Sequence, residues 1–439
     1  MIMFFTKLAW GIATIMIIGT GLYFTLQFRF MQFNIKALFS SLKNSFKVNN
    51  SSISPFESLT MSLAARIGVG SLAGVALAIY IGGVGTAFWM WISALIAASN
   101  ALGETILGVV YRKKDEKDIY KGGPPYYIKY GLGKDALAKV VALLIAFSYI
   151  FGFLTIQANT ITKSIVSISK IYPPLIGLII SFVTALIIFQ GVKGIANISS
   201  KLVPIMGIIY IAASLVIIIL NINQFPYILT TIIKSAFTPK AVNGGIFGSI
   251  VIGMQRGIFS NEAGLGTSAI ASATTTENKP VEIGLNQVLG VYFTTLVICS
   301  MTAFVIMTTN YNALVLNDIN GIEITMYAFK YHYGFYGELL VIVTIILFAF
   351  STIIAGYYYG ESCLKFLINN IRAYQLFILR LITTILLIAG SIVSSIYLWN
   401  FVDLLVALIA IVNLYSLVLL KKDIKFEIEE YKRKNNMIK

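Results

Sequence analysis

Charge is scarce in this 439-residue sequence. Aspartate, glutamate, lysine and arginine make up 12% of it, whereas soluble proteins contain about 25%. No long polar stretch separates the apolar runs, which argues against independent soluble domains. Apolar runs of about 20 residues, the length of a membrane-spanning helix, recur from end to end. The sequence therefore predicts an all-α polytopic membrane protein with a single membrane domain.

Histidine and cysteine are also rare. The one histidine, His332, is predicted to lie in an outer loop, where a role as a proton relay is not indicated. Cys299 and Cys363 both lie in apolar segments, so we expect reduced, buried side chains and no disulfide. The sequence shows no metal-binding cluster, catalytic triad or phosphate loop. These absences argue against an enzyme, and no organic cofactor is predicted.

The apolar segments predict about eleven transmembrane helices. They cover residues 8–26, 56–82, 86–111, 137–165, 173–190, 199–220, 241–273, 283–309, 336–366, 376–394 and 400–420. The first segment lacks a small-residue cleavage site, so we interpret it as a retained helix and not as a signal peptide.

The basic residues predict the orientation. They outnumber the acidic ones by 33 to 18 but are scattered among short loops, which is typical of topology signals facing anionic lipid and argues against nucleic acid binding. With the N-terminus outside, most of them lie inside, and residues 421–439 form a basic cytoplasmic tail. The predicted location is the cytoplasmic (inner) membrane of a bacterium, and no obligatory protein partner is indicated.

Residues 33–47 follow the first span and have an amphipathic pattern. Their apolar side chains fall on one helical stripe, and the lysines lie about a quarter-turn away. This pattern predicts an interfacial helix with lysines reaching toward the headgroups, and a solvated loop is the alternative. Residues 1–55 would thus form an N-terminal unit ahead of the main bundle.

Two polar, glycine-rich stretches interrupt the apolar pattern at mid-membrane depth. The first is RIGVGS at residues 66–71, and the second is EAGLGT at residues 262–267. Both have the same order of residue types: a charged residue, a small or apolar residue, glycine, an apolar residue, glycine and a hydroxyl residue. Each lies in the first helix of a five-helix set, residues 56–220 and 221–420, and the two sets run in opposite directions. Corresponding breaks in two inverted halves indicate a transporter binding site.

Physical chemistry explains why a transporter would contain such breaks. Glycine permits unwound backbone, and each break creates free N–H groups that attract a carboxylate and free carbonyls that attract a cation. A zwitterionic amino acid together with a sodium ion needs that combination. The alternative is that the glycines only allow close helix packing, but intramembrane charge at both breaks favours the binding site.

Several stretches resemble the alanine or glycine:cation symporters of the amino acid–polyamine–organocation superfamily. The matching stretches are residues 65–91, 122–128 (GGPPYYI), 157–159 (QAN), 253–266 (GMQRGIFSNEAGLG) and 348–361 (FAFSTII…YYGE). The resemblance implies a leucine-transporter-like (LeuT-like) five-plus-five inverted repeat with an extra N-terminal helix and broken helices 1 and 6. It also implies sodium-driven import of a small neutral amino acid.

The resemblance also implies which residues form the sites. The substrate site would include Gly68, Val69, Gly70, Ser71, Gln157, Gly264, Leu265, Gly266 and Gly356. The sodium ligands would be the carbonyls of Ala64 and Ile67 and the hydroxyls of Ser351 and Thr352, hard oxygens that suit a hard cation. The alternative for both hydroxyls is a hydrogen bond to the preceding helical turn. Asn159, two residues from Gln157, should face a neighbouring helix instead.

The sequence departs from the family pattern near the expected pocket. Residues 68–71 usually read Gly-Thr-Gly-Asn, and a Trp, a His and a Pro usually stand where this sequence has Gly356, Ser272 and Ala269. Losing a Trp should enlarge the cavity. We therefore hypothesise a substrate bulkier than alanine or glycine.

Four charged residues in apolar segments form a further candidate group. Arg66, Arg256, Glu262 and Glu104 are predicted to join one polar network that holds the broken helices and couples ion binding to gating. The alternative is a static network in which buried charges only satisfy one another. Asn100 lies four residues before Glu104 on the same helix face, for which we favour a structural role.

The sequence as a whole predicts a sodium-coupled symporter working by alternating access. Proton coupling is an alternative because Glu262 or Glu104 could titrate. A channel would need a polar face running through the membrane, and a membrane enzyme would need a catalytic constellation. Neither is visible in the sequence.

Overall fold

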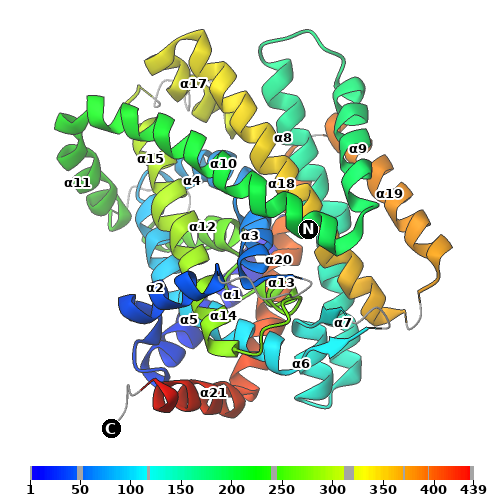
Figure 1. The fold of residues 1–439 in the computed structure, drawn as a ribbon. Coiled ribbons are helices and arrows are strands. Elements are labelled where there is room, and N and C mark those ends of the chain that lie inside the picture. Colours follow the sequence, from blue (N-terminus) through cyan, green and yellow to red (C-terminus); the bar gives the residue numbers. More distant parts are fainter. Residues whose placement is uncertain are drawn as a thin grey trace.

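The computed structural model describes residues 2–46, 53–115, 119–238, 245–310, 321–368, 371–393 and 395–435 as a helical bundle (Figure 1). The helices of the bundle are α1 (Ile2–Gln27), α3 (Pro55–Arg66), α4 (Val75–Gly82), α5 (Thr86–Val110), α7 (Asp135–Phe147), α8 (Leu154–Val166), α9 (Pro173–Ile188), α10 (Gly191–Leu220), α12 (Gly245–Asn261), α13 (Thr267–Ser272), α14 (Pro280–Tyr292), α15 (Ser300–Met307), α18 (Phe335–Leu367), α19 (Ala373–Ile392) and α20 (Ser395–Leu419). Three π-helical turns, η2 (Gly70–Gly74), η3 (Ser148–Phe153) and η5 (Phe293–Cys299), continue helices within it.

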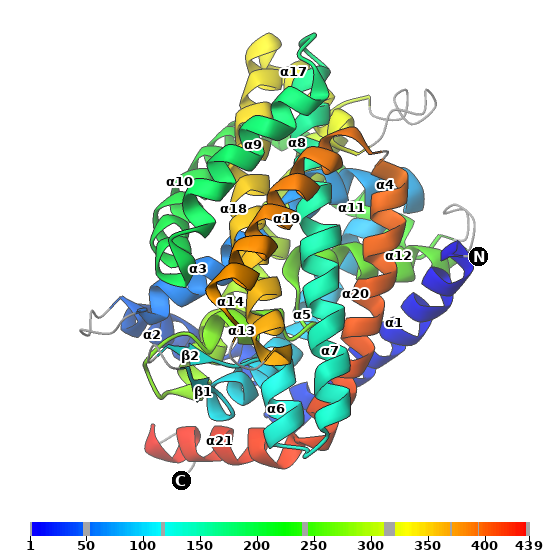
Figure 2. The same cartoon turned by 90° about the vertical axis from the view of Figure 1, so that its right-hand side faces the viewer.

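The remaining elements are short or lie at the ends of the bundle. They are η1 (Met31–Phe33), α2 (Ile35–Ser45), β1 (Lys113–Lys114), β2 (Tyr120–Lys121), α6 (Pro124–Tyr130), η4 (Ile222–Gln224), α11 (Phe225–Ala236), α17 (Ile322–Tyr333) and α21 (Lys421–Lys434). Strands β1 and β2 pair antiparallel. Figure 2 shows α21 lying across one end of the bundle, next to α6.

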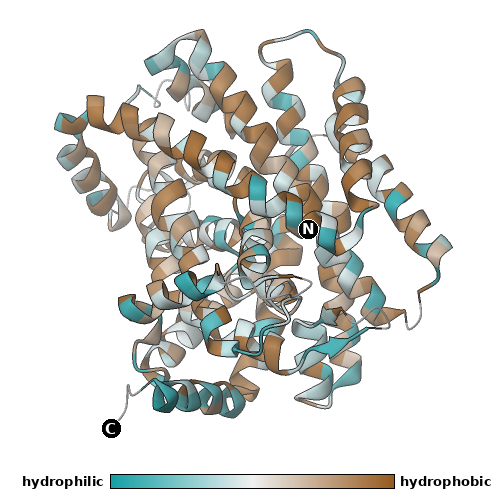
Figure 3. Cartoon of the chain, viewed as in Figure 1, coloured by the Kyte–Doolittle hydropathy of each residue, from teal (hydrophilic) through white to brown (hydrophobic). Residues whose placement is uncertain are grey.

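The protein is an all-α polytopic membrane protein, as predicted. Eight helices of the described residues are long and apolar enough to cross a membrane, or nine when α3 and the bent continuation Gly70–Gly82 count as one span. Figure 3 shows apolar ribbon along most of the bundle and a largely hydrophilic α21. The shorter apolar helix α9 and the interrupted pair α12–α13 would raise the number to the predicted eleven. That number, the boundaries of the two five-helix sets and the orientation of the termini stay predictions.

The core of the bundle is built around α5, α12 and α13. In the most apolar 18-residue stretch of α5, 83% of the residues are buried. The corresponding share is 33% in α10 and 28% in α19, which face outward. Helix α5 packs against α12, α13 and α14, and α1 packs against both α5 and α20. The breaks in α3–α4 and α12–α13 therefore lie in the most enclosed part of the molecule.

Local sequence signals explain several helix starts. Ser54 and Glu57 form a capping box at the start of α3, where the Ser54 hydroxyl accepts from Glu57 N at 3.1 Å. Proline stands in the first turn of α3, α6, α9 and α14, where its missing N–H is not needed by the helix.

Three peripheral segments test the sequence predictions. Helix α2 forms where the interfacial helix was predicted, with Asn34 capping its N-terminus, while Lys47 lies outside the described residues. Its position at the membrane surface stays a prediction. The segment around His332 was expected to be a loop, but it is helix α17, where the imidazole Nε2 lies 2.8 Å from Thr308 Oγ1. The tail after residue 420 forms helix α21, whose Ile424 and Ile428 are buried against the bundle.

Candidate substrate and ion site

The first break separates α3 from the turn η2. Helix α3 ends at Arg66, Ile67 has φ −84° and ψ 75°, and the continuation bends by 49°. A Cβ on Gly68 would collide with the Thr352 hydroxyl of α18, and one on Gly70 would lie 2.9 Å from the Phe259 ring of α12. Both glycines thus allow other helices to approach the opened backbone closely.

The second break separates α12 from α13. Glu262, Gly264 and Gly266 all have a positive φ, at 55°, 90° and 78°. The amide of Gly266 donates to Glu104 Oε2 at 2.9 Å, and Asn413 Nδ2 donates to the Gly264 carbonyl at 2.8 Å. Side chains from α5 and α20 therefore bind the backbone that the helix no longer satisfies.

The two breaks lie near each other across the centre of the bundle. Ser71, just after the first break, has its hydroxyl 3.1 Å from that of Ser260 on α12. The Ser260 hydroxyl is in turn 3.0 Å from Cys299 Sγ. From α8, Gln157 Oε1 accepts from the amide of Val69 at 3.1 Å, inside the first break. The structure thus brings together three of the predicted substrate-site residues, Val69, Ser71 and Gln157.

Three of the four predicted sodium ligands, Ala64, Ser351 and Thr352, also converge. Thr352 Oγ1 lies 2.9 Å and Ser351 Oγ 3.2 Å from the Ala64 carbonyl, so both hydroxyls of α18 reach the last turn of α3. Each hydroxyl also contacts the Phe348 carbonyl one turn back, at 3.0 and 2.8 Å respectively, which is the alternative arrangement. Ile67 is the C-cap residue that directly follows α3. The cluster offers hydroxyl and carbonyl oxygens, the donor type that a sodium ion takes.

One predicted substrate-site residue, Gly356, has a different environment from the one expected. A Cβ on Gly356 would lie 3.0 Å from the Tyr149 ring and 3.2 Å from Leu154, so these side chains occupy the space where an enlarged cavity was expected. Leu265 is almost fully buried within the second break. Asn159 donates to the carbonyls of Gly390 and Val393 at 2.9 and 2.7 Å and so faces a neighbouring helix, as predicted.

The predicted four-residue charge network is wrong in one member. Arg256 forms a buried, two-pronged ion pair with Asp403 of α20, at 3.1 and 2.6 Å, and its guanidinium stacks over Trp399. The prediction failed because the partner lies far away in the sequence. Asp403 is the only charged residue in residues 400–420, and an isolated carboxylate in an apolar run could have revealed it.

The other three charges surround the second break. Glu262 accepts from the Tyr149 hydroxyl at 2.6 Å and from Thr267 at 2.9 Å. Glu104 accepts from Ser268 at 2.7 Å and from Asn413 at 3.0 Å, in addition to the amide of Gly266.

Arg66 completes the group from the first break. Its Nη1 donates to the Gln287 carbonyl at 3.1 Å, while Nε and Nη2 have no hydrogen-bond partner among the described residues. Its charge is within electrostatic range of Glu262 and Glu104 without touching either. Asn100 reaches only toward the Ile17 carbonyl, at 3.4 Å, which agrees with a structural role.

Comparison with known proteins shows the family of this chain. All of the chain, residues 1–439, matches the model of the sodium:alanine symporter family. The amino-acid carrier protein AlsT of Bacillus subtilis is 37% identical over 94% of this chain and 87% of its own length. The sodium/alanine symporter AgcS of Methanococcus maripaludis is 34% identical over 94% of this chain and 92% of its own length. The Bacillus subtilis protein described as "Probable sodium/glutamine symporter GlnT" is 35% identical over 95% of this chain and 87% of its own length.

Proposed function

Because the chain belongs to the sodium:alanine symporter family and is a transporter rather than an enzyme, we propose that it imports a small neutral amino acid together with sodium by alternating access. One observation carries the proposal. Two helix breaks lie in the buried centre of the bundle. Ser71 lies beside the first break and Ser260 beside the second, and their hydroxyl oxygens are 3.1 Å apart. Hydroxyls from α18 reach the end of α3 at the first break.

The residues at the breaks have separate roles in this proposal. The substrate carboxylate and amine bind the backbone of residues 68–71 and 264–266, where helical hydrogen bonding is interrupted. Gln157, already bonded to Val69 N, orients the first break. Sodium binds between α3 and α18 at Ala64, Ile67, Ser351 and Thr352, and joins the two helices while it is present.

The proposal includes the architecture. Residues 56–220 and 221–420 form two inverted five-helix repeats of the leucine-transporter type, and the protein lies in the cytoplasmic membrane with its N-terminus outside. The corresponding positions of the two breaks support this arrangement. Alternating access then consists of one set of helices moving against the other around the site.

The size of the substrate is a finer part of the proposal. Alanine and glycine are the first candidates because Tyr149 and Leu154 fill the space beside Gly356. A longer neutral amino acid is the second, because one relative is described as a probable sodium/glutamine symporter. Competition against labelled alanine distinguishes them: displacement by glycine and alanine alone excludes the longer substrate.

Transport assays in proteoliposomes test the function. An imposed sodium gradient at clamped pH should drive uptake, and unlabelled amino acid inside should accelerate it. A channel shows no such acceleration from the far side. Uptake driven only by a pH gradient would instead favour proton coupling, for which the buried carboxylates of Glu262 and Glu104 are the candidates.

A further inference from the structure

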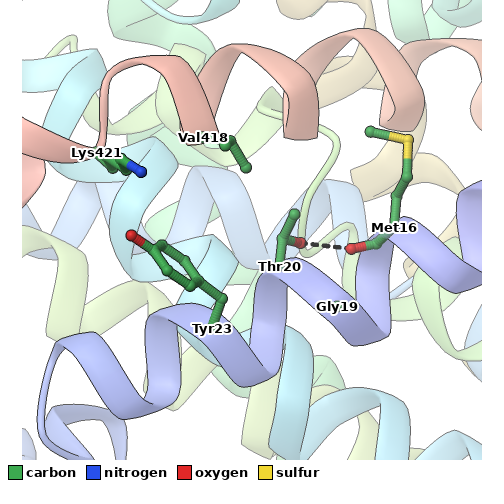
Figure 4. A pocket seen from close by; sticks show the side chains of 6 residues that line it. All are labelled: Met16, Gly19, Thr20, Tyr23, Val418 and Lys421. Atoms are coloured by element: carbon green, nitrogen blue, oxygen red, sulfur yellow. Dashed lines mark hydrogen bonds between the residues drawn. The ribbon is translucent and has the colours of Figure 1, made fainter.

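A groove on the outer surface of the bundle is separate from the transport site. It lies between α1 and the junction of α20 with α21 and has a volume of about 280 Å³ (Figure 4). Its lining consists of Met16, Gly19, Thr20, Tyr23, Val418 and Lys421. Gly19 leaves the groove open, because a Cβ there would meet no atom within 4 Å.

The lining of the groove is apolar along most of its length. The one hydroxyl in this apolar part, that of Thr20, donates to the Met16 carbonyl at 2.7 Å, so its hydrogen-bond donor is already satisfied within α1. Beside the groove, α1 exposes Ile15, Leu22 and Leu26, which marks this side as the face toward hydrocarbon. A ligand here comes from the bilayer.

One end of the groove is polar and positively charged. The Lys421 ammonium lies 5.5 Å from the centre of the Tyr23 ring, and Figure 4 shows the Tyr23 hydroxyl pointing toward it. Two other charges on α21 have partners: Asp423 accepts from Tyr111 at 3.0 Å, and Lys425 pairs with Glu429 at 3.5 Å. Within the described part of the chain, no carboxylate forms an ion pair with Lys421.

We propose that this groove binds one anionic phospholipid. An acyl chain lies along Met16, Gly19 and Val418, and the phosphate contacts Lys421 and the Tyr23 hydroxyl. The chemistry fits because Lys421 stands where the apolar span α20 gives way to the polar helix α21, the depth of lipid headgroups. The bound lipid bridges α1, the peripheral N-terminal helix, to α20 and α21.

Native mass spectrometry of the purified full chain tests the proposal. Phosphatidylglycerol and phosphatidylcholine with identical acyl chains are each titrated into the detergent-solubilised protein. We expect one phosphatidylglycerol per chain, bound about fivefold more tightly than phosphatidylcholine, the factor for one lysine near a phosphate. Lys421→Gln should abolish this preference, while Lys425→Gln, whose lysine is paired on the same helix, should keep it.

A second pair of variants tests the groove itself. Gly19→Leu should fill it and reduce retention of both lipids. Gly11→Leu is the matched control, because it adds the same side chain on the same helix, where a Cβ likewise meets open space. Equal retention by the wild type, Lys421→Gln and Gly19→Leu would overturn the proposal. Displacement of the bound lipid by inorganic phosphate would also overturn the proposal, because Lys421 would then be holding an adventitious ion only.

Discussion

The two helix breaks differ in how their backbone is held. In the first, residues 67–69, no residue has a positive φ, and one neutral side chain, Gln157, bonds the backbone at Val69. In the second, residues 262–266, three residues have a positive φ. Three side chains bond the backbone there: the carboxylate of Glu104 and the amides of Asn413 and Asn261.

This difference suggests a division of labour. Hydrogen bonds to a carboxylate are stronger than those between neutral groups, and left-handed backbone persists only where its surroundings hold it. The second break is therefore a fixed part of the scaffold. The first has weaker neutral contacts, and the hydroxyls of Ser351 and Thr352 beside it can turn toward an ion, so we infer that ligands act mainly there.

The largest expected effect comes from a side chain in the second break. Gly266→Ala puts a Cβ at φ 78° and 2.9 Å from both Asn413 Oδ1 and Tyr127 Oη. Strain and collision together should destabilise the protein by about 3 kcal/mol or more. Gly133→Ala is the control: its φ is 68°, but a Cβ meets open space, so only about 1–2 kcal/mol should be lost. Thermal unfolding in detergent measures both, and equal losses would show that packing at Gly266 is unimportant.

At the first break, a ligand substitution should change function more than stability. Thr352→Ala removes a hydroxyl directed at Ala64 and should raise the sodium concentration for half-maximal uptake about tenfold, as expected for a lost contact to a charge. Thr344→Ala is the matched control on the same helix, because its hydroxyl bonds only the Leu340 carbonyl one turn back. If both variants keep the wild-type sodium dependence, Thr352 is a structural hydroxyl. Thr352→Ser should restore most of the affinity.

Gln157 tests whether the first break contacts the substrate. Gln157→Ala leaves Val69 N without its protein partner and should raise KM for the amino acid about fivefold, with a smaller change in kcat. Asn159→Ala removes two bonds to carbonyls near the end of α19 and should lower thermal stability while leaving KM unchanged. Uptake kinetics with both variants separates the roles, and an unchanged KM in Gln157→Ala would remove this residue from the site.

The sequence located both breaks because their signals are local: paired glycines and isolated charges in apolar runs are visible without knowing the fold. Contacts between distant segments could not be read in this way. The partner of Arg256 is 147 residues away, and the filling of the space beside Gly356 depends on the rotamer of Tyr149 on another helix. The sequence predicted the tail only as basic, although the spacing of Ile424 and Ile428 is that of one helix face.

The smallest expected loss of stability comes from a substitution of Glu262. This substitution shows whether Glu262 only holds the second break in place or also couples sodium binding to gating. In Glu262→Gln, the hydroxyls of Tyr149 and Thr267 can rotate to accept as well as donate, so stability should fall by less than about 1 kcal/mol. Glu104→Ala should cost more, about 1–3 kcal/mol, because it leaves the amide of Gly266, which can only donate, without its acceptor.

The transport of the Glu262→Gln variant then decides its role. Arg66 loses a nearby negative charge, so if these groups couple sodium to gating, the sodium dependence of uptake should shift about fivefold, the lower end for coupled sites, while the protein stays folded. Normal uptake with unchanged sodium dependence would make Glu262 a static part of the scaffold. Every test would then assign the same roles: the ion and most of the substrate contacts would act at the first break, and the second break would hold the site in place.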